Sequence, residues 1–542
     1  MQVRRLAAWA ALPLAVTLGL TACGKSGGSD SGSANQNGVV SIGISEPKHL
    51  IPTNTAETGG SQVLSALFAP LVDFDEANKP FEVAAQEITT TDNKTWTIKL
   101  KDGWTFHNGE PVTADSYINA WNYGAYGPNA QDNNYFFDKV EGYKAMNPAE
   151  ATAKPEADTL SGLKKVDENT FTVTLSAPFS EFKSLLGYTA FYPLPKAAWE
   201  NDTASPLVLK KDFEQAPVGN GPFKIKGTWQ HDSQVEVEKY DAFAGTKPHI
   251  GGALFKIYQN SDAEYADLLA NNLDVVKQIP TESLSTVQGD LGDRFQQSPS
   301  SSFTFLAFPT FDPRFKDVDV RKAISMAIDR EEIANKIFQG SQKAAYSFTS
   351  PVVAGYRDKT CGTACEFNPT EAKSLYESAK GPKTLNISYN ADGPHKQWVE
   401  ATCNQLKANL GVECAATPEP KFADLLTKVK AKEDVGMFRL GWAFDYPSME
   451  NYLGPLYATG GSSNYYGYSN PEFDSLVKAG TEAPTAEEAI KKYQEAEDIL
   501  AKDLPVLPLR FGQNVFGHST KVKNVAIDLF TRVDLNKIES VG

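Results

Sequence analysis

The stretch "GLTACGKS" (Gly19–Ser26) has the spacing of a phosphate-binding loop, G-x-x-x-x-G-K-[ST]. In such a loop, backbone N–H groups at the start of a helix bind nucleotide phosphates, so a helix must follow. Here "GGSDSGSANQNG" follows, which has too few apolar residues to form a packed helix. The overlapping "GKSGG", which fits the G-x-S-x-G of serine hydrolases, fails for the same reason. We therefore expect neither nucleotide chemistry nor a nucleophilic serine at this position.

Metal chemistry also lacks a suitable arrangement of residues. The six histidines are scattered, with no H-E-x-x-H and no close pair, at positions 49, 107, 231, 249, 395 and 518. A C-x-x-x-C pair, Cys361 and Cys365, could bind zinc, but His395 is the only histidine near it in the sequence. We expect no metal and no other cofactor, and an extracytoplasmic hydrolase is the least favoured class of function.

Four cysteines, Cys361, Cys365, Cys403 and Cys414, lie in the second half of the chain. An even number in an exported protein predicts two disulfides, and three pairings are possible. We favour the local pairing, Cys361–Cys365 with Cys403–Cys414. "CGTAC" would close a tight loop, and Cys414 lies three residues after Gly411, where the helix that carries Cys403 should end.

The first 22 residues have the pattern of a secretory signal peptide. Arg4 and Arg5 precede the apolar run "LAAWAALPLAVTLGL", which is too short for the roughly 20 residues of a membrane span. The stretch "LTAC" that ends at Cys23 resembles the lipobox of bacterial lipoproteins. That resemblance implies cleavage before Cys23 and attachment of acyl chains, palmitate among them, to this cysteine. Two or three chains hold a soluble domain at a membrane, and residues 23–37 would form the tether. The alternative is an ordinary signal peptide with an incidental cysteine.

Removal of the signal leaves roughly 520 residues, enough for two or three domains. The net charge of the whole chain is −15, and loss of Arg4 and Arg5 brings it to −17. Nucleic acid and anionic lipid carry negative charge and would repel such an acidic chain. We therefore expect neither nucleic acid as a partner nor broad adhesion to anionic lipid. We expect a membrane link through the lipid alone, on the extracytoplasmic face of the cell membrane.

Strand-like and helical patterns alternate along the mature chain, which predicts an α/β protein with more than one sheet. β-Branched and aromatic runs predict strands at 39–44, 95–100, 170–175, 233–240, 253–258, 273–279, 302–308, 384–389 and 436–442. Apolar residues three or four positions apart predict helices around 319–328, 399–410 and 490–500. Residues 147–162 have the composition of a surface insertion.

Several stretches together resemble the solute-binding proteins of peptide ABC importers, the extracytoplasmic oligopeptide- and dipeptide-binding proteins. They are "DGWTFHNGEPVTADSYINAW" (102–121), "FDPRFKDVDVRKAISMAIDREEI" (311–333), "GWAFDYPSMENYLGPLY" (441–457) and "LPVLPL" (504–509). The resemblance runs over essentially the whole mature chain. It implies capture of oligopeptides and delivery to a permease with its ATPase subunits, by a protein that we expect to be a monomer.

The fold that the resemblance implies has two lobes, with a ligand cleft between them and a hinge of crossing strands. Lobe I would comprise 38–82, 216–303 and 508–542, with an inserted subdomain at 83–215, and lobe II would comprise 304–507. The chain would cross between lobes near 303–308 and 505–510. Closure of such lobes around a ligand would signal occupancy to the permease.

The resemblance also implies site residues, because a protein that accepts many peptides must bind the backbone and the charged ends. Asp445 would receive the α-amino group of the peptide; the alternative is an aspartate that caps a turn. Further candidates are the aromatic residues Trp442, Phe444, Tyr446, Tyr465 and Tyr466 and the loop residues Glu57, Thr58 and Gly59. Trp442 has the strand parity of Leu440 and could instead be core, whereas Tyr465 and Tyr466 lie in a Gly/Ser-rich loop that favours exposure. Arg321 and His107 are expected to be structural, as an ion pair on its helix and as part of a turn.

The nearest rival is the same fold with another ligand, such as an oligosaccharide, nickel or another small solute. A metal chelate would favour histidine or arginine in the cleft, and a sugar would favour tryptophan stacking. Trp442 and Trp398 do not distinguish these ligands.

Overall fold

The computed structural model describes residues 37–75, 78–148, 153–391, 393–433 and 436–541. The predicted signal peptide, Cys23 and the tether up to residue 36 lie outside the described residues, as does part of the predicted insertion at 147–162. Among the described helices, none has the length and hydropathy needed to cross a membrane. Within the same residues, no three His, Cys, Asp or Glu side chains are grouped as metal ligands.

One 11-stranded mixed sheet runs through most of the chain, in the order β15-β14-β16-β12-β17-β11-β1-β10-β9-β8, with β13 paired to β17. Its strands are β1 Val39–Ile44, β8 Phe223–Ile225, β9 Gln234–Lys239, β10 Gly252–Ile257, β11 Val275–Val276, β12 Phe295–Ala307, β13 Gln342–Ala344, β14 Thr384–Asn390, β15 Glu413–Glu419, β16 Met437–Trp442 and β17 Val506–His518. The runs of β-branched and aromatic residues therefore become strands, as predicted.

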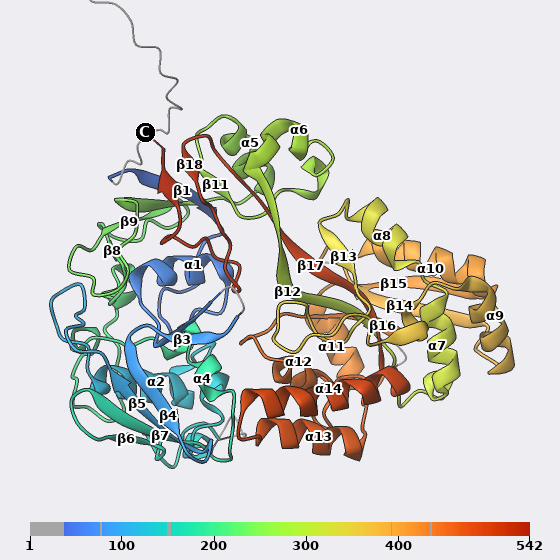
Figure 1. Cartoon of the computed structure of the whole chain (residues 1–542), viewed down its shortest axis with the longest axis horizontal. Helices are drawn as coiled ribbons and strands as arrows, with labels where there is room; N and C mark the ends of the chain where they lie inside the picture. Colours follow the sequence, from blue (N-terminus) through green and yellow to red (C-terminus); the bar gives the residue numbers. More distant parts are fainter. Residues whose placement is uncertain (1–36, 76–77, 149–152, 392, 434–435, 542) are drawn as a thin grey trace, which may run out of the picture. The chain divides into compact units, whose positions relative to one another are not determined.

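The two longest strands, β12 and β17, connect the two halves of this sheet (Figure 1). They pair antiparallel from Phe295 opposite Gly517 to Ala307 opposite Val506. At one end β17 pairs with β11, and at the other end β12 pairs with β16. The register shifts between Pro299 and Phe303, where neither of those outer strands is present. Both strands are longer than the sequence pattern indicated, and they include the residues at which we expected the chain to cross.

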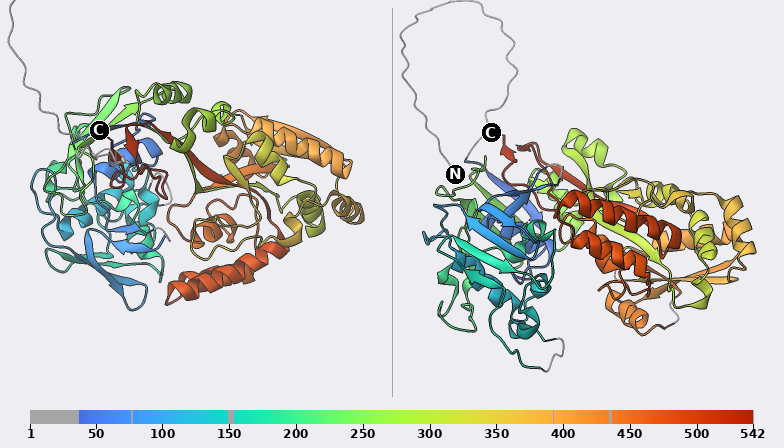
Figure 2. Two further views of the ribbon diagram at one scale, coloured as in Figure 1. Left: turned by 45° about the horizontal axis from the view of Figure 1, so that its top comes forward. Right: turned by 60° about the horizontal axis from the view of Figure 1, so that its bottom comes forward.

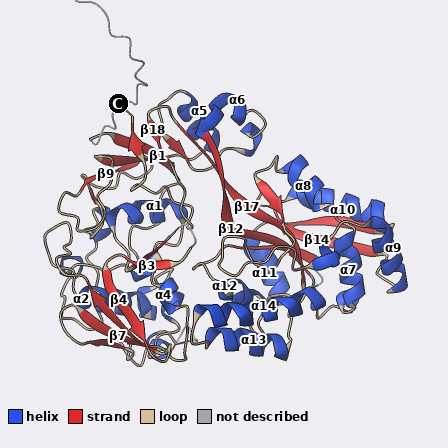
Figure 3. Cartoon of the chain, viewed as in Figure 1, coloured by secondary structure: helices blue, strands red, loops and turns tan. Residues whose placement is uncertain are grey.

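The buried apolar residues divide in the same way as the sheet. Two clusters consist of buried residues from 40–291 and 516–538, together with Tyr446. Two others draw on residues 303–511 and lie on the two faces of the β14–β16–β12–β17 region, which helices cover on both sides (Figure 3). This division agrees with two lobes connected through β12 and β17; the lobe boundaries remain predictions.

A separate four-stranded antiparallel sheet, β4-β5-β7-β6, lies within the predicted inserted subdomain. Its strands are β4 Ala85–Thr90, β5 Thr95–Leu100, β6 Leu163–Lys165 and β7 Thr170–Thr174. Helix α2 Ala114–Ala125 packs on it through Tyr117 and Trp121, whose rings contact Phe171 of β7. As expected for a turn scaffold, the Nδ1 atom of His107 accepts a hydrogen bond from the Gly219 N–H (3.1 Å) and its Nε2 contacts the Gly221 carbonyl (3.3 Å).

The remaining regular elements are helices and two short antiparallel strand pairs. The helices are α1 Thr58–Leu67, α3 Tyr143–Met146, α4 Phe182–Leu185, α5 Ser261–Leu269, α6 Val287–Leu291, α7 Val318–Met326, α8 Arg330–Ile337, α9 Pro369–Ser378, α10 Lys396–Leu410, α11 Phe422–Lys430, α12 Glu450–Tyr457, α13 Pro471–Thr481 and α14 Ala486–Asp503. The pairs are β2 Val72–Phe74 with β3 Pro80–Glu82 and β18 Val522–Lys523 with β19 Glu539–Ser540. Helices α13 and α14 lie side by side, as the right view of Figure 2 shows.

Helix α10 illustrates how the sequence sets local structure. Its buried residues recur at helical spacing, from Trp398 to Leu410. It ends at Gly411, whose φ of 71° is a left-handed conformation that glycine adopts without strain. The chain then turns into β15, which brings Cys414 to Cys403, and the structure contains this disulfide.

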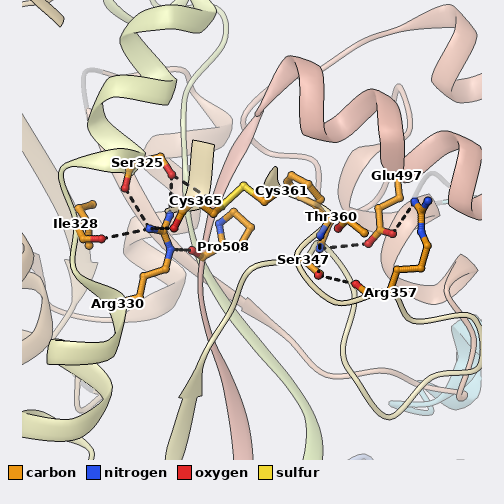
Figure 4. The surroundings of a disulfide bond; sticks show 11 residues. Ser325, Ile328, Arg330, Ser347, Arg357, Thr360, Cys361, Cys365, Glu497 and Pro508 are labelled. Atoms are coloured by element: carbon orange, nitrogen blue, oxygen red, sulfur yellow. Dashed lines mark hydrogen bonds and ion pairs between the residues drawn. A yellow bond between two sulfur atoms is a disulfide. The ribbon is translucent and has the colours of Figure 1, made fainter. Parts of the chain in front are cut away.

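The second disulfide, Cys361–Cys365, lies beside a buried arginine (Figure 4). Arg330, which is 3% exposed, donates hydrogen bonds to the carbonyls of Ser325, Ile328, Cys365 and Pro508 and to the Ser325 hydroxyl. It thereby connects α7, α8, the disulfide loop and β17. A buried cation is stabilised only when its donors are satisfied, and here backbone carbonyls satisfy them.

Arg321 behaves in the same way, and one expectation about it is wrong. Instead of an ion pair, its guanidinium donates to the backbone carbonyls of Phe315, Lys316, Asp503 and Leu504. These bonds join α7 to the end of α14. Carbonyl partners cannot be read from sequence, because every residue carries one.

Candidate functional site

Asp445 follows β16 at the carboxyl edge of the second-lobe strands. β14 pairs parallel with both β15 and β16, so the carboxyl ends of these three strands meet at one edge. In open α/β sheets, ligands bind outside the carboxyl ends of the strands. The turn that carries Asp445 therefore lies where this fold class binds ligands.

Among the described residues, the Asp445 carboxylate accepts hydrogen bonds from two neutral groups. Tyr135 Oη donates to its Oδ1 (3.4 Å) and Asn451 Nδ2 donates to its Oδ2 (3.4 Å). The Asp445 N–H donates to Asn451 Oδ1 (2.8 Å), which fixes the turn against the start of α12. Tyr135 belongs to the predicted inserted subdomain, so this bond links the two lobes. In the part of the chain that the structure describes, no cationic side chain forms an ion pair with Asp445.

Burial raises the pKa of Asp445 to about 6, and the nearby Glu450 carboxylate adds to the effect. The bonds from Asn451 and Tyr135 and the charge of Lys139 oppose this rise in the pKa of Asp445 without cancelling it. A carboxylate in this state binds a cation favourably, because the cation offsets the cost of ionisation away from water.

Aromatic side chains lie beside Asp445, beginning with Tyr135 and Phe444. They form a continuous row in which each ring contacts the next, with centroid distances of 6.0, 5.9, 4.1 and 4.5 Å; the row is Phe444, Phe530, Tyr188, Phe136 and Tyr135. Phe444 lies directly before Asp445 and is buried. The row provides an apolar surface beside the carboxylate.

Trp442 and Tyr446 flank this position but differ in accessibility. Trp442 is half-buried, and its Nε1 donates to Asn451 Oδ1 (3.3 Å). Tyr446 is 4% exposed, its hydroxyl donates to the Glu450 carboxylate, and its ring packs edge-on against Phe179. Trp442 can therefore contact a ligand at this edge, whereas Tyr446 contributes to the packing between lobes.

The two tyrosines of the Gly/Ser-rich loop, Tyr465 and Tyr466, also differ in burial. Tyr465 is half-buried, with the Lys430 ammonium 5.3 Å from its ring centroid. Tyr466 is completely buried against Phe305 and Tyr457. The expectation of exposure is wrong for Tyr466, because the loop folds inward and supplies a core residue to the second lobe.

Glu57, Thr58 and Gly59 lie at the start of α1. Both Glu57 carboxylate oxygens accept from the Gly60 N–H, so this side chain caps the helix. A Cβ atom at Gly59 would lie 2.5 Å from the Ser45 carbonyl oxygen, so only glycine fits there. Thr58 is exposed and is the one member of the three that lines a cavity.

That cavity has a volume of 640 Å³, within the range of small-molecule sites. The ends of β1 and β11, residues 258–261 and the middle of β12 and β17 line it. Its charged residues are Glu264, Lys277 and Glu282. Burial raises the pKa of Glu264 to about 7 and lowers the pKa of Lys277 to about 8. The structure thus places Thr58 at this cavity and groups Trp442, Phe444 and Asp445 at the strand edge.

Sequence reasoning missed the residues that bond Asp445. Asn451 lies six residues after Asp445, within the 441–457 stretch that resembles the family. Its position near the start of a helix could have indicated a contact with Asp445. Tyr135 carried no signal, because its approach to Asp445 spans 310 residues of chain. Also missed was Arg439 on β16, whose Nη1 donates to Asn390 Oδ1 (2.9 Å) at the same edge.

Two lobes connected by long crossing strands, with a polar site at a strand edge, define the class of two-lobe solute-binding proteins. A family model described as "Bacterial extracellular solute-binding proteins, family 5 Middle" matches residues 81–464. The chain belongs to this family.

The similar proteins match most of the length of the chain. The oligopeptide-binding protein OppA of Bacillus subtilis (strain 168) is 27% identical over 537 residues, 95% of each chain. The periplasmic murein peptide-binding protein MppA of Escherichia coli (strain K12) is 26% identical over 476 residues, 86% of each chain. A solved structure of the MppA periplasmic murein tripeptide-binding protein, in its unliganded open form, has a TM-score of 0.82 at 22% identity. It covers 94% of this chain and 99% of that one, and supports the fold.

Proposed function

We propose that this protein captures oligopeptides between its lobes and delivers them, unaltered, to the permease of an ABC importer. The observation that carries the proposal is the Asp445 carboxylate, which is removed from water at the strand edge and accepts hydrogen bonds from the neutral side chains of Tyr135 and Asn451. A peptide α-amino group is the cation that this position would accept. The names of OppA and MppA, as oligopeptide- and murein peptide-binding proteins, support the same ligand class.

Tryptophan fluorescence tests this function directly, because Trp442 lies beside Asn451 and Asp445. Titration with a random pool of tri- to hexapeptides should give a saturable change. A response to oligosaccharides or Ni²⁺ in place of peptides would assign the fold to another solute. Recovery of the peptide in cleaved form would show an enzyme and contradict the proposal.

The pH dependence of binding follows from the pKa of Asp445. Its pKa of about 6 lies above the ordinary 3.8, and a bound ammonium would lower it again. Affinity should therefore be fully present above about pH 7 and fall as the pH drops through 6, approaching tenfold per unit below it. Calorimetric titrations between pH 4.5 and 7.5 measure this. A flat profile would remove Asp445 from the ligand contacts.

We further propose that acyl chains on Cys23 hold the protein at the outer face of the cell membrane. Its support is the lipobox-like "LTAC" before a polar tether. Mass spectrometry of the membrane fraction should find the mature N-terminus at an acylated Cys23, and Cys23→Ser should leave the protein uncleaved or soluble. A mature soluble protein that begins elsewhere would contradict the anchor.

A further inference from the structure

The predicted inserted subdomain contacts the second lobe directly, in addition to the connection through β12 and β17. The Ser180 N–H donates to the Thr481 carbonyl (3.0 Å), and Ser180 Oγ donates to the Gly480 carbonyl (3.4 Å). The Asn93 side chain donates to the Ala483 carbonyl (2.6 Å). The segment before α4 and the turn before β5 therefore bind the end of α13, across about 300 residues of chain.

Glu181 places a carboxyl group in this contact, next to Ser180. Burial raises the pKa of Glu181 to about 7, and the Glu450 carboxylate of α12 adds to the effect. The hydroxyls of Ser184 and Ser448 oppose this rise in the pKa of Glu181, the former at 3.5 Å from Oε2. Among the described residues, no lysine or arginine forms an ion pair with Glu181. Two carboxyl groups from opposite sides of the contact thus lie close together without a cation between them.

The groups of the second lobe that face Glu181 are acidic or neutral. Glu450 is 8% exposed, and its carboxylate accepts a hydrogen bond from the Tyr446 hydroxyl. The Tyr493 hydroxyl of α14 is buried near the hydroxyls of Ser180 and Thr481. Burial, with the two nearby glutamates, raises the pKa of Tyr493. No group on α12 or α14 that faces Glu181 therefore compensates a negative charge there.

One further carboxylate and one ammonium group complete the charges around this contact. Asp445 lies near Glu450, and the charges of Glu450 and Lys139 both act on it. The Lys139 ammonium lies 4.8 Å from the ring centroid of Phe179, two residues before Glu181. With every group ionised, three carboxylates face one ammonium, so ionisation of Glu181 makes the two sides repel each other.

We propose that Glu181 is an acid-dependent latch, whose protonated carboxyl group holds the lobes of the empty protein together and whose ionisation releases them. When the lobes separate, Glu181 returns to water and moves away from Glu450, so the closed form binds the proton more tightly than the open form. Lower pH therefore favours closure. A latched protein must open before a ligand enters, so the latch lowers the apparent affinity for any ligand. The proposal goes beyond the proposed function, because it concerns the protein without ligand.

The size and the pH range of the effect follow from the pKa of Glu181 in the two forms. That pKa is about 7 in the contact, and we expect the ordinary 4.5 in the open form. The ratio of closed to open molecules should be greatest below pH 4.5 and fall by up to tenfold per unit between pH 4.5 and 7. Above pH 7 it should be constant, after a total change of about 300-fold.

Small-angle X-ray scattering of the unliganded full chain between pH 5 and 8 measures the compact and extended populations. Wild type should become more extended as the pH rises. Glu181→Gln keeps a neutral side chain that forms hydrogen bonds, so at pH 8 its ratio of compact to extended molecules should exceed that of wild type at least tenfold. Glu450→Gln removes the facing charge and should lie between the two. Glu141→Gln changes an exposed glutamate of the same subdomain and should match wild type.

Two outcomes would overturn the latch. One is a radius of gyration of wild type that is the same from pH 5 to 8. The other is a full pH dependence in Glu181→Gln, which would assign the effect to another group such as Asp445. Should Glu181→Gln fail to fold, Glu450→Gln decides, because an unchanged pH dependence in that variant would also contradict the pairing of the two glutamates. No ligand enters these measurements, so their result is separate from that of the peptide titrations.

Discussion

Replacing Asp445 with asparagine should weaken the binding of unmodified peptides by about 100-fold or more. Loss of one partner from a desolvated ammonium–carboxylate pair leaves the other charge unpaired, which costs roughly 2–5 kcal/mol. Asparagine has the shape of aspartate and keeps an oxygen that accepts from Tyr135, so the effect should come from the charge. Calorimetry or tryptophan fluorescence at pH 7.5 measures it.

The control for this experiment is a double-mutant cycle with an N-acetylated peptide. Acetylation removes the ammonium, so wild type should bind the capped peptide weakly and Asp445→Asn should weaken it little further. Asp424→Asn is a matched variant, because Asp424 is an exposed aspartate on α11 of the same lobe. It should leave both affinities unchanged. Additive effects of Asp445→Asn and acetylation would show that the two groups do not meet.

Replacing Arg330 with methionine should lower the free energy of unfolding by about 3–5 kcal/mol. The change leaves the carbonyls of Ser325, Ile328, Cys365 and Pro508 without their donor in a region that water reaches poorly. Because Arg330 connects α7, α8, the disulfide loop and β17, the whole second lobe should lose stability. Denaturant unfolding followed by tryptophan fluorescence measures this, and a collapse in soluble yield would show the same effect.

Lys336→Met is the matched control for Arg330→Met. It makes a similar change on the same helix, but the Lys336 side chain is 74% exposed and forms an ion pair with Glu332 one turn away. Such a pair contributes well under 1 kcal/mol. If Arg330→Met unfolds at the same denaturant concentration as Lys336→Met, the carbonyl bonds of Arg330 do not stabilise the lobe.

Local features were predictable because they depend on neighbouring residues. The spacing of apolar residues determines which side of α10 is buried, and Gly411 determines where the helix ends. The end of the helix at Gly411 also places Cys414 near Cys403. The predicted strands at 39–44 and 384–389 become β1 and β14. The recognised stretch 441–457 placed Asp445 in a turn after a strand, where the structure has it.

Contacts between distant segments were not predictable in the same way. Tyr466 has the loop composition of an exposed residue, yet Phe305 and Tyr457 surround it. Arg321 has charged neighbours in sequence, yet it bonds backbone carbonyls near residue 504. The spacing of apolar residues within a segment does not show which distant segment, a hundred or more positions away, it will contact.

The amino-acid sequence alone indicated the family, the alternation of strands and helices, Asp445 as a candidate site residue and the local disulfide pairing that we favoured. Only the tertiary structure decided which groups surround that carboxylate and how burial raises its pKa. The reason is physical. Side-chain spacing governs local backbone conformation, whereas the electrostatics of a site depend on which distant groups exclude water from it.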